Sequence, residues 1–167
     1  MQAHSNIFGY FQGEKIEFVI TDELEGKSRI ERIGESLFMV VSHVDTFMAN
    51  ENYPTAISEA YHAFLFRQSK AIIEKCVKKN QVHFKTKPKK IVIDRSINKW
   101  GSCNQDRVLA FNYLLASKSP VAINYVVVHE MCHMVHLNHD RSFWRLLGSI
   151  IPNYKEVEML LNGKSID

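Results

Sequence analysis

Two histidines and a glutamate in the second half of the chain have the spacing of a metal-dependent hydrolase. His129 and His133 are four residues apart, and Glu130 directly follows the first of them. On a helix, this spacing places both imidazoles on one face, about one turn apart, where they can hold a single zinc ion. Glu130 is rotated by roughly 100° from His129 and is better placed to take a proton from water than to bind the ion. The pattern therefore predicts hydrolysis, with two histidine ligands and Glu130 as general base.

A third ligand is expected just downstream, because a catalytic zinc usually takes three ligands from the protein and keeps a fourth position open. We favour His139, which follows Asn138. Asparagine tolerates the left-handed conformation in which helices often end, and a chain reversal there would bring His139 back toward the metal. The alternatives are His136, Glu156 and Glu158.

Other polar residues near the motif are candidates for supporting roles. Asn138 or Asp140 could accept the spare N–H of a ligating histidine and so fix its tautomer. Hydrolysis also needs a donor for the negative oxygen that develops in the transition state. Tyr113, His136 and Tyr154 are candidates for this donor, and the sequence does not rank them.

The motif lies in an apolar segment that we interpret as a buried helix over 120–137. Ser119 can cap this helix, and Pro120 suits its first position. The β-branched residues 126–128 would also fit a buried strand. We prefer the helix, because only a helix places the two histidines side by side.

The remaining pattern predicts an α+β domain with a sheet packed on the active helix. Alternating or β-branched residues predict three strands near the N-terminus, arranged as a meander, and two more before the motif. Apolar residues at helical spacing predict one long helix between these groups, and Asp140 and Asn153 are possible caps of two final helices. The predicted strands are 16–20, 28–33, 37–41, 91–97 and 107–113, and the long helix is 55–80.

Composition indicates one soluble domain over residues 1–167. The chain is 46% hydrophobic, has a formal charge of +3, and contains no Pro-, Gly- or Ser-rich linker. It lacks a signal-like N-terminus and any run of eighteen apolar residues, so we expect a cytoplasmic protein with no membrane partner. Its three cysteines, Cys76, Cys103 and Cys132, are expected to be free thiols in a reducing compartment.

The segment 70–90 contains eight lysines and one acidic residue, Glu74. Such lysines usually form a solvated helix face. The alternative is a contact surface for phosphates, in a nucleotide or a nucleic acid. Nucleic-acid binding is possible but is not predicted here, since no aromatic residues are interleaved with the lysines.

Several blocks of the sequence are similar to the YgjP-like metal-dependent hydrolases, which are related to the SprT-like metallopeptidases. The blocks are Lys99-Trp-Gly-Ser-Cys103, Phe111-Asn-Tyr113, Tyr125-Val-Val-Val-His-Glu-Met-Cys-His133, Asn138-His-Asp-Arg-Ser-Phe-Trp144 and Pro152-Asn-Tyr154. The resemblance implies a small zincin-like (gluzincin-type) fold with metal ligation by His129, His133 and His139. In such folds an edge strand beside the metal can pair with an extended substrate, and 107–113 is our candidate. The alternative is that Phe111 and Tyr113 simply share one packed face of a sheet.

We therefore expect a zinc-dependent hydrolase with one Zn²⁺ ion. A metallopeptidase acting on peptides or proteins is the first hypothesis, because a glutamate beside two zinc-binding histidines serves this chemistry so often. A nucleoside triphosphate pyrophosphatase is the alternative, and a noncatalytic zinc-stabilised binding module is a third possibility. The oligomeric state does not follow from the sequence.

Overall fold

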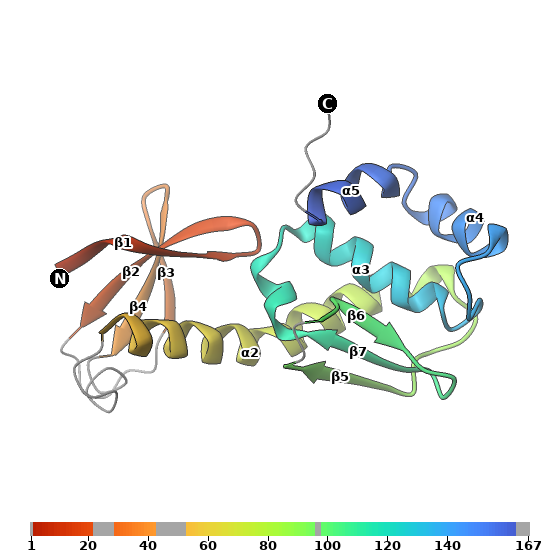
Figure 1. The fold of residues 1–167 in the computed structure, drawn as a ribbon, viewed down its shortest axis with the longest axis horizontal. Coiled ribbons are helices and arrows are strands. Elements are labelled where there is room, and N and C mark those ends of the chain that lie inside the picture. The colour runs from red at the N-terminus through yellow and green to blue at the C-terminus, as the bar shows by residue number, and fades with distance from the viewer. Residues whose placement is uncertain (1, 22–28, 43–52, 96–97, 163–167) are drawn as a thin grey trace.

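The computed structural model describes residues 2–21, 29–42, 53–95 and 98–162. Within these residues the chain has two small sheets, and the long helix α2 (Tyr53–Asn80) runs from one to the other (Figure 1). The first sheet contains β1 (Gln2–Phe11), β2 (Glu14–Thr21), β3 (Arg29–Ile33) and β4 (Ser36–Ser42). The second sheet contains β5 (Lys90–Asp94), β6 (Gly101–Cys103) and β7 (Val108–Asn112). The α+β prediction is confirmed.

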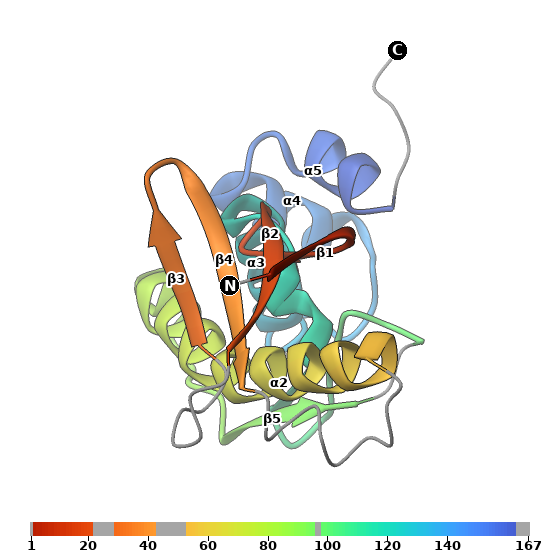
Figure 2. The ribbon, with the colours of Figure 1, turned by 90° about the vertical axis from the view of Figure 1, so that its left-hand side faces the viewer.

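The first sheet has the order β1-β2-β4-β3, so the predicted meander is wrong. Strands β2, β3 and β4 fall where the alternating pattern predicts them, whereas β1 was not predicted. Strand β4 pairs in parallel with β2 rather than following β3 outward. Ile16 and Phe18 of β2 and Met39 of β4 are buried against α2. Figure 2 shows β4 lying across α2. The hydrophobic alternation fixes which face is buried, but it does not fix the order of the strands.

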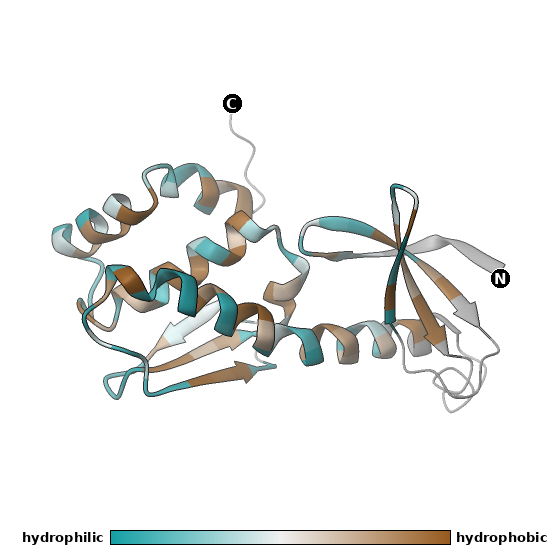
Figure 3. Ribbon diagram, turned by 180° about the vertical axis from the view of Figure 1, so that it is seen from behind, coloured by the Kyte–Doolittle hydropathy of each residue, from teal (hydrophilic) through white to brown (hydrophobic). Residues whose placement is uncertain are grey.

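Helix α2 has the predicted extent and contributes to two apolar cores. Ile57 and Leu65 pack into the core beneath the first sheet, whereas Ile73 and Val77 pack into the core around the second sheet. Figure 3 shows hydrophobic and hydrophilic residues alternating along α2, as expected for a helix with one buried face.

The second sheet has the order β5-β7-β6, so β7 is its central strand. The prediction that 107–113 forms a substrate-binding edge strand is therefore wrong, because both edges of β7 are already paired. The two edge strands are β5 and the short strand β6, and β6, which the sequence pattern missed, is the edge that lies beside the histidines. The predicted strand 91–97 ends as β5 at Asp94, and residues 96–97 lie outside the described part.

Helices form the layer opposite the second sheet: α3 (Pro120–Cys132), α4 (Arg141–Ile150) and α5 (Tyr154–Leu161). Ser119 caps α3 by accepting a hydrogen bond from Ala122 N, and Pro120 opens the helix, as predicted. Nine of its thirteen residues are buried, which explains why its sequence has a continuous apolar run rather than a stripe. The predicted end at 137 is wrong, since α3 stops at Cys132 and a tight turn follows. None of the helices in the described ranges is both long and apolar enough to cross a membrane.

The turn between β1 and β2 docks on the segment that leads into α3. Gln12 N and Gly13 N donate to the carbonyls of Ala116 and Ser117, at 2.9 and 3.1 Å. Both turn residues have positive φ, as two-residue hairpin turns require. A Cβ on Gly13 would lie 2.9 Å from Ser119 Cα, so only glycine fits this contact.

We expect Gly13→Ala to lower the free energy of unfolding by about 2 kcal/mol or more, from left-handed strain plus the backbone clash. Gly34→Ala is the matched control, because Gly34 also has positive φ but a Cβ there meets nothing within 4 Å. The control should lose only about 1 kcal/mol. Urea denaturation of both variants measures the difference, and equal losses would contradict the docking contact.

Candidate active site

Three histidine side chains converge beyond the end of α3. Helix α3 carries His129 and its C-cap His133, and the following turn brings His139 back to them. His139 Nε2 lies 2.9 Å from His129 Nε2 and 3.1 Å from His133 Nε2. Nitrogen ligands of a tetrahedral zinc ion, each bonded at about 2.0–2.1 Å, lie about 3.3 Å apart. The three imidazoles therefore have the donor type and the spacing of a zinc site.

The hydrogen bond of His133 leaves the correct nitrogen free for a metal. Its Nδ1 lies 3.0 Å from the carbonyl oxygen of His136, and only a protonated Nδ1 can donate to this oxygen. The lone pair is then on Nε2, which faces the other two rings. The prediction that Asn138 or Asp140 accepts this N–H is wrong for His133, because the backbone carbonyl of His136 accepts it. Asp140 instead caps α4 by accepting from Ser142 N and Phe143 N.

The environment of His129 favours its neutral form, which is the form that binds metal. Burial, followed by its two histidine neighbours, lowers the pKa of His129 to about 4. Burial is also the main reason why the pKa of His133 is lowered. Within the described residues, His129 Nδ1 is a buried polar atom without a hydrogen-bond partner.

An aromatic stack holds His139, which is more exposed than the other two histidines. The Trp144 ring lies between the rings of His139 and Tyr154, with centroid distances of 5.5 and 5.3 Å. Trp144 Nε1 also donates to the His139 carbonyl at 3.0 Å. The fully buried Phe143 lies beneath all three imidazoles, at 4.6–5.0 Å. The start of α4 thus fixes the position of the third histidine.

Glu130 is buried beside this cluster and packs against β6. Only 6% of the residue is exposed, and burial raises the pKa of its carboxyl to about 7 although Lys99 acts in the opposite direction. A Cβ on Gly101 would lie 2.7 Å from Glu130 Cγ, so the Trp-Gly-Ser block must have glycine at this point. No sequence pattern had connected this block with the glutamate.

Two cavities meet at Glu130. One, of about 350 Å³, lies between β6 and the three histidines and is also lined by the exposed Leu137. The other, of about 240 Å³, shares Gly101, His129 and Glu130 and continues toward α5. Glu130 therefore lines both cavities, together with Gly101 of the edge strand β6 and His129 of the histidine cluster.

The second cavity contains a tyrosine that the sequence analysis missed. Tyr125 lies one turn before His129 on α3, with ring centroids 5.8 Å apart, so helical spacing could have found it. Its hydroxyl interacts with Glu158, and burial, together with Glu158, raises the pKa of Tyr125 well above its ordinary value. Glu158 was an alternative metal ligand, but in the structure it lines this cavity with Tyr125. Neither Glu156 nor Glu158 belongs to the histidine cluster.

The candidates for the transition-state donor lie at very different places. Tyr113 interacts with His62 Nδ1 at 3.1 Å and packs with the core of the first sheet. Tyr154 stacks on Trp144, and His136 follows α3 and contributes its carbonyl to His133. Asn153 precedes α5 without the predicted side-chain cap.

The cysteines remain thiols in this environment. All three are free, and burial is the main cause that raises the pKa of Cys103 to about 11 and of Cys132 to about 12. Thiolate, not thiol, is the metal-binding form. The histidines are therefore the better donors in this part of the molecule.

Comparison with known proteins shows the family. The chain matches the model of the YgjP-like, metallopeptidase domain family over residues 4–164, and it belongs to this family. The crystal structure of the metallopeptidase zymogen of Pyrococcus abyssi abylysin has 15% sequence identity and a TM-score of 0.49, covering 57% of this chain and 99% of that chain. Among curated proteins, none matches. Membership of the family supports a metal-dependent peptidase.

The histidine cluster predicts a measurable metal site. We expect His139→Ala to weaken zinc binding by at least about tenfold, because one of three converging donors is lost. His136→Ala is the control, since it removes a nearby imidazole but keeps the backbone carbonyl that accepts from His133. Competition with a chromogenic chelator measures both affinities. Equal affinities of the two variants would contradict ligation by His139.

Proposed function

We propose that the chain is a zinc peptidase in which His129, His133 and His139 hold one Zn²⁺ ion and Glu130 is the general base. The observation that carries this proposal is the convergence of three imidazole nitrogens, within 4.8 Å of one another, beside a buried carboxylate in an open cleft. The histidine-only donor set suits zinc at a catalytic site, where one coordination position stays open.

The role of each residue follows from its position. When bound, zinc would supply the Lewis acidity that makes water nucleophilic near neutral pH. Glu130 takes the proton from the attacking water and returns it to the departing amine. The absence of a side chain at Gly101 leaves room for the Glu130 side chain, and this largely buried residue lines the cleft with the histidines.

The substrate in this proposal is an extended peptide. Strand β6 is one of the two edge strands of its sheet, and its residues Gly101, Ser102 and Cys103 line the cleft opposite the histidines. A peptide that adds to this edge would pass the cluster with its backbone hydrogen-bonded to β6. Its side chains on either side of the cleaved bond would enter the two cavities that meet at Glu130.

The nucleotide alternative has less support. Lys75 and Lys79, from the lysine-rich segment, line a cavity with Pro120 and Asn124, at the start of α3. His129 and His133 lie at the opposite end of this helix. Phosphates bound by these lysines would therefore not reach Glu130.

We also propose that residues 1–167 form one domain, because Ile72 of α2 packs against both apolar cores.

Glu130→Gln tests the proposed chemistry. We expect peptide hydrolysis to fall by about 10²- to 10⁴-fold with zinc content unchanged, because the amide cannot accept the proton. Glu156→Gln, an exposed change on α5, is the control and should keep full activity. The assays use a quenched-fluorescent peptide library and an unfolded protein, with release of pyrophosphate from nucleoside triphosphates in parallel.

Each outcome of this assay separates the functional hypotheses. Hydrolysis of triphosphates that depends on Glu130 would replace the peptidase proposal with a pyrophosphatase. If removal of zinc unfolds the wild type while no substrate is turned over, a noncatalytic zinc-stabilised module would replace it instead.

Gly101→Ala tests the placement of Glu130. The added methyl would push the Glu130 side chain, and a displacement of about 1 Å at a reacting group can cost about 10²-fold in rate. Zinc affinity should stay at the wild-type value, since the three atoms nearest to this Cβ position all belong to Glu130. Gly148→Ala in α4 is the control, because its Cβ meets Tyr154 at an ordinary 3.4 Å. Full activity of the Gly101 variant would disprove this role of the glycine.

A further inference from the structure

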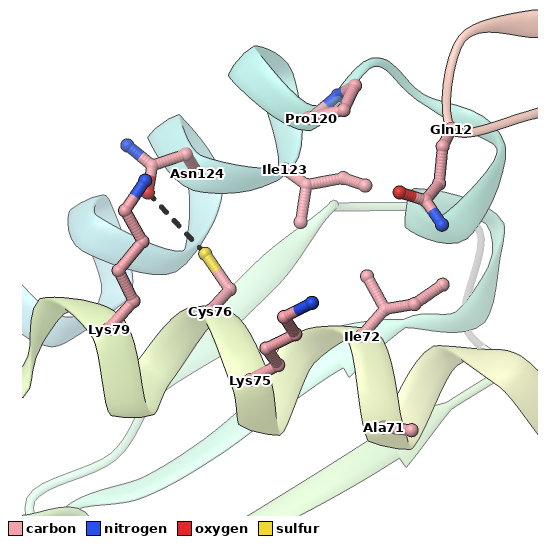
Figure 4. Close-up of a pocket in the computed structure, with 9 residues that line it drawn as sticks. All are labelled: Gln12, Ala71, Ile72, Lys75, Cys76, Lys79, Pro120, Ile123 and Asn124. Carbon is pink, nitrogen blue, oxygen red and sulfur yellow. Dashed lines mark hydrogen bonds between the residues drawn. The ribbon is translucent and has the colours of Figure 1, made fainter.

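A separate cavity lies at the other end of α3, away from the histidines. It has a volume of about 510 Å³ and is lined by residues of α2, the start of α3 and the turn between β1 and β2 (Figure 4). Its floor is apolar, with Ile72 from α2 and Ile123 from α3. Volumes of 300–1,000 Å³ with mostly apolar walls are typical of small-molecule sites.

Two lysines give this cavity a positive rim. Lys75 and Lys79 lie one turn apart on α2, and Figure 4 shows both side chains extending from the helix beside the cavity. No acidic side chain is among the described residues that line it. The acidic residue of this helix segment, Glu74, is instead paired with Lys70 at 3.8 Å. The charge of the two rim lysines is therefore available to an anion.

The polar groups of the wall are held in place. Asn124 Oδ1 accepts hydrogen bonds from Asn80 Nδ2 at 2.8 Å and from Cys76 Sγ at 3.5 Å. Asn80 is only 5% exposed, which ties this end of α2 to α3. The side chain of Gln12 closes the opposite end (Figure 4). A wall that is fixed before binding costs a ligand less ordering entropy.

We propose that this cavity binds a small amphipathic anion, with a carboxylate or phosphate head between Lys75 and Lys79 and an apolar body against Ile72 and Ile123. The two ammonium groups form charge-assisted hydrogen bonds with the head group. The aliphatic floor buries the apolar body. The site is separate from the proposed catalytic centre, since its residues lie at the start of α3 and Glu130 lies near the end.

Isothermal titration calorimetry with octanoate, octyl phosphate and neutral 1-octanol tests this site. We expect saturable one-to-one binding of at least one anion and much weaker binding of 1-octanol. Stronger binding of octanoate or of octyl phosphate identifies the preferred head group. In the double variant Lys75→Gln, Lys79→Gln, anion affinity should fall about tenfold, the range expected for two partly exposed ion pairs.

Two further variants test whether the anion binds in this cavity and at these two lysines. Lys85→Gln with Lys87→Gln removes the same charge from exposed positions that do not line the cavity, and should bind as the wild type does. Ala71→Phe fills the cavity from an exposed position on α2 and should abolish binding while the thermal midpoint stays unchanged. The proposal is overturned if neither anion binds, if 1-octanol binds equally well, or if the two double variants behave alike. Binding should persist in Glu130→Gln, so this test is independent of the peptidase assay.

Discussion

The site depends on one constraint, which is that α3 must stop at Cys132. If the helix continued, His139 would be carried away along its axis at about 1.5 Å per residue. The turn after Cys132 instead returns the chain, and the carbonyl of His136 in this turn accepts a hydrogen bond from His133 Nδ1. One short segment thus closes the histidine cluster and sets the tautomer of one of its members. The α4 cap at Asp140 then places Phe143 and Trp144 against the rings.

Burial of Glu130 is the second requirement, and it is unfavourable by itself. A carboxylate with 6% exposure loses most of its hydration, which is why its pKa rises to about 7. The surrounding structure supplies the stability that this burial removes, since nine residues of α3 are buried and most of them are apolar. Because Gly101 has no side chain, β6 can lie close to the glutamate. The edge strand and the proposed base are therefore parts of one packed unit.

Helix α3 separates two chemically different environments. Its C-terminal end presents the histidine cluster to a cleft, while its N-terminal end meets the cationic side of α2 across an apolar cavity. Helix α2 connects this region with the first sheet, and the Gln12-Gly13 turn of that sheet docks directly before α3. The first sheet thus supports the segment from which the active helix starts, although it contributes no residue to the histidine cluster.

Much of this structure could be predicted from the sequence, because the signals are local. The spacing of His129 and His133, the Ser119-Pro120 start and the long helical pattern in α2 each depend on neighbouring residues, and the alternating strands identify their buried faces. The sequence also favoured His139 over its alternatives. Only the tertiary structure decided the parallel pairing of β2 with β4, the edge position of β6 and the contact of Gly101 with Glu130. These features join segments distant in the chain, and side-chain periodicity carries no information about which strand or helix will lie opposite.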